Sequence, residues 1–182
     1  MGHVCPWWHA YTFDNPLRRL IHNPRAIVGE HVGEGMRVLD LGCGMGFFSI
    51  AMARMVGDSG CVVAVDLQQK MLDVLMRRAE RAGVAARIRP HRCEAGRIGV
   101  EDEVDFALAV WMLHETPDAR EFASQVRGVL RPGGRFLVAE PAHHVWPKQF
   151  ERLLGSVQAA GLRECGRPRV RFSRAALFER AD

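Results

Sequence analysis

Hydrophobic residues in this chain gather in short continuous runs, which alternate with stretches of helical periodicity. The continuous runs predict buried parallel strands, and the helical stretches predict the connecting helices. The clearest helical stripe places apolar side chains on one face and stops at Gly83. The expected strands are Arg37–Leu41, Cys61–Asp66, Val104–Val110 and Arg135–Glu140. The expected helices are Gly46–Val56, Gln69–Ala82, one from Pro117 and Asp118 to the turn Arg131–Gly134, and Trp146–Ala160.

Smaller elements are expected at the two ends of the chain. Asparagine followed by proline is a helix-start signal, and it occurs twice before the first strand. The expected elements are helices at Pro16–His22 and Pro24–Val32, a short strand near Arg87–Pro90, and two strands between Leu162 and Arg180 around Arg167 and Pro168. Strands that alternate with helices predict a mostly parallel α/β sheet with right-handed crossovers.

Three glycines separate the first strand from its helix. Asp40 lies just before them, and Gly42, Gly44 and Gly46 follow a G-x-G-x-G spacing. A dinucleotide fingerprint needs its third glycine at Phe47, so a loop that cradles a pyrophosphate is not predicted. Glycines let the backbone approach a bulky ligand, and the Asp40 carboxylate suits a cationic or amino group.

A second carboxylate, Asp66, ends the next predicted strand. It lies about 20 residues beyond the glycines, where an acid in a Rossmann-like unit accepts hydrogen bonds from ribose hydroxyls. NAD-dependent enzymes share this device, so Asp66 alone does not separate the two nucleotide classes. Asp40 and the glycine spacing do separate the two classes, because neither fits a pyrophosphate.

Together and in order, these motifs resemble those of the class I S-adenosylmethionine-dependent methyltransferases, and among them the small UbiE-like or type-11-like enzymes. The segment Leu130–Val138 resembles the turn before the fifth strand of that family. The resemblance implies a Rossmann-like, doubly wound, mostly parallel seven-stranded sheet with a C-terminal antiparallel hairpin and short N-terminal helices. Residues 1–34 are then an N-terminal helical lid or cap, and residues 35–182 form the methyltransferase domain.

The resemblance also implies where S-adenosylmethionine binds. The glycine loop and Asp40 are expected to hold its amino-acid tail, and Asp66 its ribose. Leu67 or Met71 is expected against one face of the adenine, with Glu94 at the adenine amino group. The full set of expected cofactor contacts is Asp40, Gly42, Cys43, Gly44, Gly46, Asp66, Leu67, Met71, Glu94 and Trp111.

Methyl transfer is an in-line displacement, in which alignment and exclusion of water supply much of the rate enhancement. A base is needed only if the acceptor arrives protonated. The catalytic candidates are His114, Glu115 and His144, with Glu140, His143 and His9 as further polar candidates. The alternative is that His114 and Glu115 cap the loop before the next helix. His143 and His144 are adjacent and point oppositely in an extended segment, so no metal is expected.

The N-terminal run around Trp7 and Trp8 has two interpretations. The rings either pack the first helices onto the sheet or form a lid, where aromatic faces stabilise a sulfonium or a cationic substrate. Cys5 beside them leaves a thiol or arsenite acceptor as a minor hypothesis. Trp111, at the end of the fourth strand, is expected to line the acceptor pocket.

Net charge and cysteine spacing limit the classes of partner and ligand that the sequence predicts. The 182 residues are expected to form one enzyme domain, and a net charge of +4 does not by itself indicate nucleic acid. The five cysteines lack C-x-x-C spacing, so neither a disulfide framework nor a zinc site is predicted. The absence of a spanning apolar run and of a signal-peptide core predicts a cytoplasmic protein with no membrane partner.

The leading hypothesis is methylation of a small-molecule acceptor, because only residues 1–34 and two loops remain to cover it. One alternative is methylation of protein or RNA docked through the basic C-terminal hairpin. Another is a non-catalytic cofactor-binding module in a hetero-complex. The segment Val110–Leu113 lacks the Asn/Asp-Pro-Pro-aromatic turn of base amino-methyltransferases, which argues against nucleic-acid bases. A homodimer that buries the tryptophan-rich N-terminus is left open.

Overall fold

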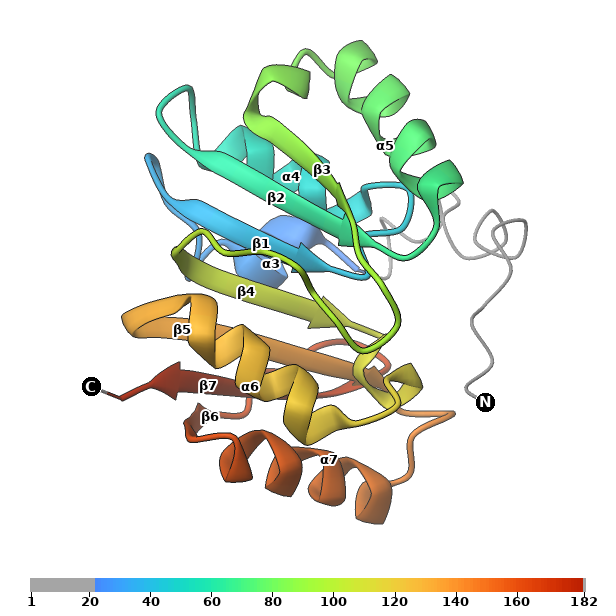
Figure 1. Cartoon of the computed structure of the whole chain (residues 1–182), viewed down its shortest axis with the longest axis vertical. Coiled ribbons are helices and arrows are strands. Elements are labelled where there is room, and N and C mark those ends of the chain that lie inside the picture. The colour runs from blue at the N-terminus through green and yellow to red at the C-terminus, as the bar shows by residue number, and fades with distance from the viewer. Residues whose placement is uncertain (1–21, 182) are drawn as a thin grey trace. The chain divides into compact units, whose positions relative to one another are not determined.

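A computed structural model of the chain describes residues 22–181 (Figure 1). The chain divides into two compact units, which meet between Cys93 and Glu94 in the sequence. We call residues 22–93 the N-terminal unit and residues 94–181 the C-terminal unit. The predictions that concern Cys5, Trp7, Trp8, His9 and the helix at Pro16–His22 lie outside the described residues.

The N-terminal unit alternates strands and helices. Its strands β1 and β2 have the predicted bounds, and β2 pairs in parallel with both β1 and β3. The elements are α3 (Pro24–Val28), β1 (Arg37–Leu41), α4 (Phe47–Met55), β2 (Cys61–Asp66), α5 (Gln69–Arg81), a 3-10 turn at Ala85–Arg87, and β3 (Ile88–Arg92). Every residue of β1 and β2 after the first is buried, which explains why continuous apolar runs located these strands.

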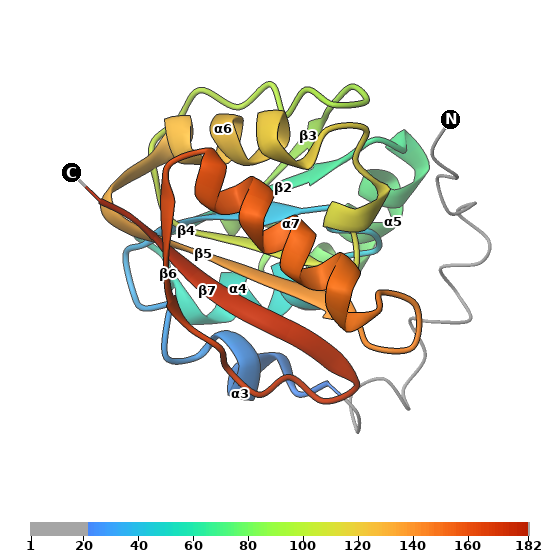
Figure 2. The ribbon, with the colours of Figure 1, turned by 90° about the horizontal axis from the view of Figure 1, so that it is seen from below.

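The C-terminal unit combines parallel and antiparallel strands. Its elements are β4 (Val104–Val110), a 3-10 turn at Leu113–Glu115, α6 (Ala119–Val129), β5 (Leu130–Pro141), α7 (Pro147–Ala159), β6 (Leu162–Gly166) and β7 (Ser173–Arg180). Strand β4 is parallel to β5, whereas β7 is antiparallel to both β5 and β6. Helix α7 packs against α6 and against the β6–β7 hairpin (Figure 2).

The strand order β3-β2-β1-β4-β5-β7-β6 describes one seven-stranded sheet. It confirms the Rossmann-like, mostly parallel architecture with an antiparallel C-terminal hairpin. None of the helices among residues 22–181 is long and apolar enough to cross a membrane.

Two predicted boundaries are wrong. The turn expected at Arg131–Gly134 lies within β5, because Leu130 already pairs with Val104 and the register then shifts so that Arg135 pairs with Phe106. The residues between them form an irregularity in the ladder. The helix expected to reach Val32 ends at Val28, where Gly29 follows and the next residues form turns. Glycine is a poor helix former, which explains the early end.

Candidate active site

The loop between β1 and α4 takes its shape from three glycines. Gly42, Gly44 and Gly46 have φ angles of 65°, 53° and 86°, in the left-handed region where other residues are strained. A Cβ atom built on Gly44 has no atom within 4 Å, so open space adjoins this part of the loop. The backbone at Gly44 is therefore accessible to a ligand.

Asp40 is a buried carboxylate at the end of β1, with 3% of its surface exposed. The Ser49 hydroxyl in α4 donates a hydrogen bond to Asp40 Oδ2 over 2.5 Å. A buried charge is costly unless hydrogen bonds hold it, and this bond fixes the orientation of the carboxylate. Ser49 was missed in the sequence, although its place in the first turn of the predicted helix was a usable signal.

Asp66 connects the end of β2 to the glycine loop. Its Oδ2 accepts a hydrogen bond from the Gly44 N–H over 2.9 Å, and its Oδ1 accepts one from the Gln68 N–H over 2.9 Å. Burial raises the pKa of Asp66, and these backbone donors offset part of the rise. A carboxylate has about four acceptor positions, so Asp66 retains capacity for further hydroxyl donors.

The remaining predicted residues of the N-terminal unit supply apolar surface. Leu67 is half-buried and follows Asp66 directly, and Met71 is buried in the first part of α5. Burial, and then the charges of Asp40 and Asp66, raise the pKa of the Cys43 thiol well above its ordinary range. The raised pKa favours the neutral thiol form of Cys43.

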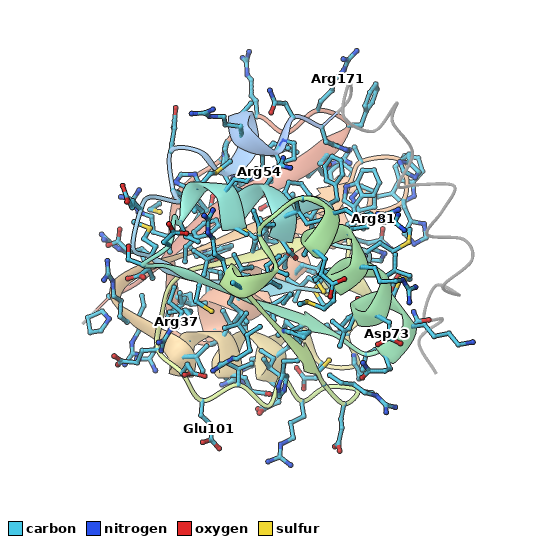
Figure 3. All side chains as sticks on the ribbon, turned by 90° about the horizontal axis from the view of Figure 1, so that it is seen from above. Arg37, Arg54, Asp73, Arg81, Glu101 and Arg171 are labelled. Atoms are coloured by element: carbon cyan, nitrogen blue, oxygen red, sulfur yellow. The ribbon has the colours of Figure 1, made fainter. Side chains whose placement is uncertain are left out.

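A cavity of about 1240 Å³ lies among α3, α4 and α5 in the N-terminal unit. Met45 and Gly46 of the glycine loop line it, but Asp40 and Asp66 do not. Its charged lining consists of arginines, including Arg54 on α4 and Arg81 on α5 (Figure 3). The large cavity is therefore not the space that the two carboxylates border.

Glu94 and Trp111 belong to the C-terminal unit. Glu94 is exposed, in a turn closed by backbone hydrogen bonds to Arg97 in both directions over 3.2 and 3.1 Å. Trp111 follows β4 with a φ of 60°, a strained conformation for a residue with a side chain. Its indole Nε1 donates a hydrogen bond to Ser173 Oγ over 2.9 Å. Its ring packs edge-on against the His143 ring, with 6.3 Å between the ring centroids. Such strain is concentrated at functional positions in proteins.

His114 and Glu140 form the central pair of the C-terminal unit. His114 Nδ1 lies 2.5 Å from Glu140 Oε2, and the His114 backbone N–H donates to Glu140 Oε1 over 3.2 Å. The Glu140 side chain is completely buried, whereas the His114 side chain is 17% exposed. Glu115 Oε1 lies 4.0 Å from His114 Nε2. The His144 ring packs edge-on against the His114 ring, with 5.1 Å between the ring centroids.

These neighbours determine the acid–base behaviour of His114. Burial lowers the pKa of His114, but the hydrogen bond and charge of Glu140, with a smaller contribution from Glu115, raise it above its ordinary value. Because Glu140 occupies Nδ1, Nε2 is the nitrogen available to take up a proton. The structure thus brings all three predicted catalytic residues together around a carboxylate-held imidazole.

His143 and His144 have different partners despite being adjacent. The two residues lie in a turn at residues 142–144, not in the extended segment that the sequence predicted. The His143 ring contacts Trp111 and the His144 ring contacts His114. Within the described residues, no group of three His, Cys, Asp or Glu side chains is arranged to hold a metal ion.

Residues 38–134 match the family model of a methyltransferase domain. The chain is 31% identical over 64% of its length to the demethylmenaquinone methyltransferase of Lactobacillus johnsonii. It is 32% identical over 71% of its length to the ubiquinone/menaquinone biosynthesis C-methyltransferase UbiE of Azotobacter vinelandii. These matches cover 48% and 49% of the two relatives, so the chain spans about half the length of the curated proteins that it resembles.

A solved structure of an S-adenosylmethionine-dependent methyltransferase from Aquifex aeolicus has a similar fold. The two chains superpose with a TM-score of 0.87 at 23% identity, over 98% of this chain and 100% of the other. The likeness therefore extends beyond the segment that the family model covers.

Proposed function

Because the chain belongs to the class I S-adenosylmethionine-dependent methyltransferase family, we propose that it transfers a methyl group from S-adenosylmethionine to a small-molecule acceptor. The observation that carries this proposal furthest is the buried Glu140 carboxylate that holds His114. The pair provides a positioned base for an acceptor that arrives protonated. The names of both relatives refer to quinones, which supports a small quinone-related compound as the acceptor class. The His114 base suits such a compound when it carries an ionisable hydroxyl.

The N-terminal unit has features that fit the cofactor. The open space at Gly44 admits a ligand against the backbone, and the Asp66 carboxylate retains acceptor positions for the ribose hydroxyls. Asp40 provides a buried negative charge for the amino group of the methionine tail. Leu67 or Met71 provides apolar surface for the adenine. When bound, S-adenosylmethionine supplies the electrophilic methyl group.

His114 is the general base in this proposal. Its Nε2 accepts the proton of the acceptor hydroxyl, while Nδ1–H donates to Glu140, which stabilises the resulting imidazolium. A phenol or enol that has lost its proton carries electron density on the oxygen and on the carbon next to the C–O carbon. The same base therefore serves methylation of either atom. After methylation of carbon, that carbon releases its proton to water and the oxygen regains one from the imidazolium, which restores the hydroxyl.

The basic C-terminal hairpin provides less support for protein or RNA as the acceptor. Arg167 pairs with Glu151 and Glu164, and Arg163 pairs with Glu179. These guanidinium groups already have carboxylate partners within the C-terminal unit. The arrangement favours a structural role for part of the arginine-rich tail over docking of a nucleic acid.

The test uses methyl-labelled S-adenosylmethionine, the purified protein and a cell extract separated into small metabolites and macromolecules. We expect label in the metabolite fraction, and at least a tenfold loss of rate in His114→Gln. His91→Gln on β3 is the matched control, since it removes an imidazole from the other unit and should leave the rate unchanged. Label confined to RNA or protein would contradict the proposed acceptor class.

A further inference from the structure

Two large hydrophobic side chains of the C-terminal unit are exposed to solvent. Trp146 is 66% exposed and Phe172 is 57% exposed, and no other large hydrophobic residue within 22–181 is exposed to this degree. A single exposed apolar side chain needs no explanation, whereas a group of them marks an interaction surface. Trp146 and Phe172 form one surface only if the two loops that carry them lie side by side.

Hydrogen bonds join the two loops that carry them. The Ala142 N–H donates to the Phe172 carbonyl over 2.9 Å. Arg174 Nη1 donates to the carbonyls of Ala142 and Val145 over 2.8 and 2.9 Å. Figures 1 and 2 both show the β5–α7 loop beside the β6–β7 loop. We call residues 142–148 and 167–172 the aromatic rim.

The outward position of both aromatic residues is built into the rim. Val145 and Val170 are buried and anchor the two loops, while their neighbours Trp146 and Phe172 are exposed. Phe172 has a φ of 56°, and the Arg171 guanidinium lies 5.2 Å from the centre of its ring. The loops are thus ordered around a local core that leaves the two rings outside.

The charge of the rim is entirely positive. It contains Lys148, Arg167, Arg169 and Arg171 and no aspartate or glutamate. Arg167 pairs with Glu151 and Glu164. The side chains of Arg169, Arg171 and Lys148 are exposed, and the Arg171 guanidinium lies against the Phe172 ring. Exposed aromatic rings flanked by cations match the chemistry of an anionic lipid surface, where rings lie among the headgroups and cations meet phosphates.

We propose that the aromatic rim docks on the surface of a lipid bilayer that contains anionic phospholipids. Trp146 and Phe172 enter the headgroup region, and Arg169, Arg171 and Lys148 contact lipid phosphates. This proposal departs from the sequence prediction of no membrane partner. That prediction rested on the absence of a spanning segment, which peripheral binding does not need.

The rim also continues into the candidate acceptor site. His143 and His144 belong to the rim and contact Trp111 and His114. An apolar acceptor dissolved in the bilayer would therefore reach His114 from the docked face. This consequence rests on the proposed function, whereas the docking itself does not.

The test is flotation of the full chain with vesicles of phosphatidylcholine alone or mixed with phosphatidylglycerol. We expect binding to the mixed vesicles, and at least tenfold weaker binding for the double variant Trp146→Ser/Phe172→Asn. Serine is a good residue at a helix start and asparagine tolerates a positive φ, so this variant should keep its thermal midpoint. Arg169→Gln should weaken binding about fivefold, while the charge-matched control Arg120→Gln on α6 should not.

A second measurement follows Trp146 directly. Brominated lipid should quench part of the tryptophan fluorescence of the full chain, and this part should be lost in Trp146→Ser. The proposal is overturned if the full chain does not bind mixed vesicles, or if the double variant binds them equally well. A homodimer that the double variant dissociates, without vesicle binding, would assign the rim to a second copy. None of these measurements needs cofactor or acceptor, so their failure leaves the methyl-transfer proposal intact.

Discussion

At the scale of single residues, the His114 imidazole depends on one carboxylate. Glu140 holds Nδ1, and its hydrogen bond and charge outweigh the effect of burial on the pKa of His114. A base works in its neutral form, so kcat/KM should rise with pH through a pKa above the ordinary histidine value of 6.5. Protonation of His114 also stabilises the fold, because the pKa of His114 is higher in the folded chain than in the unfolded chain. This contribution is complete below the unfolded-state pKa and is lost as the pH rises through the folded-state pKa.

Replacing Glu140 separates its effect on the pKa of His114 from the effect of burial. Glu140→Gln removes the two larger causes that raise the pKa of His114, and leaves the smaller effect of the Glu115 charge and the burial that lowers it. We expect the acidic limb of the kcat/KM profile to move to lower pH and kcat to fall about 100-fold. Glu115→Gln should shift the limb less and in the same direction. A limb that does not move in Glu140→Gln would show that His114 is not the titrating base.

Asp66 has a testable role of its own. Asp66→Asn replaces a charged acceptor, so the affinity for S-adenosylhomocysteine should fall by about tenfold or more in a calorimetric titration. Asp73→Asn on α5 is the control, because Asp73 is exposed and bonds to Gln69 of its own helix (Figure 3). Equal affinities in the two variants would contradict the assignment of Asp66 to the ribose.

At the scale of elements, the approach of α4 to α5 depends on Gly46. A Cβ atom at this position would lie 2.8 Å from Leu75 Cγ, and its φ of 86° strains any other residue. Gly46→Ala should therefore lower the free energy of unfolding by about 2–4 kcal/mol in denaturant titrations.

Gly155 in α7 provides the matched control. A Cβ atom there has no atom within 4 Å, and the residue is exposed inside a helix. Gly155→Ala should raise the free energy of unfolding by about 0.5–1 kcal/mol. Equal destabilisation by both substitutions would indicate that the close packing at Gly46 is not the cause.

Strand prediction succeeded where burial is continuous and failed where the ladder is irregular. Strands β1, β2 and β4 are buried along nearly their whole length, so their apolar runs coincide with their bounds. Strand β5 includes Arg131–Gly134, whose residues are typical of a turn. Only the pairing of Leu130 with Val104 places them inside the strand.

At the scale of the whole molecule, a bound ligand should raise the thermal midpoint of unfolding. A ligand that binds only the folded state at about 100 times its Kd stabilises it by about 2.7 kcal/mol. For a chain of this size, that raises the thermal midpoint by about 5–10 °C. S-adenosylhomocysteine should produce this shift and NADH should not, because Asp40 is expected to oppose a pyrophosphate. A shift with NADH alone would contradict the cofactor assignment.

The sequence by itself determined the features that depend on neighbouring residues. The glycine loop, the acids that end β1 and β2, and the buried strands follow from turn chemistry and apolar runs, which are local. It also named His114 and Glu140, but as separate candidates. Their contact joins residues 26 positions apart, and the Trp111–Ser173 bond joins residues 62 apart. Only the tertiary structure decided these pairs and the aromatic rim, because strand order and register determine which distant side chains meet.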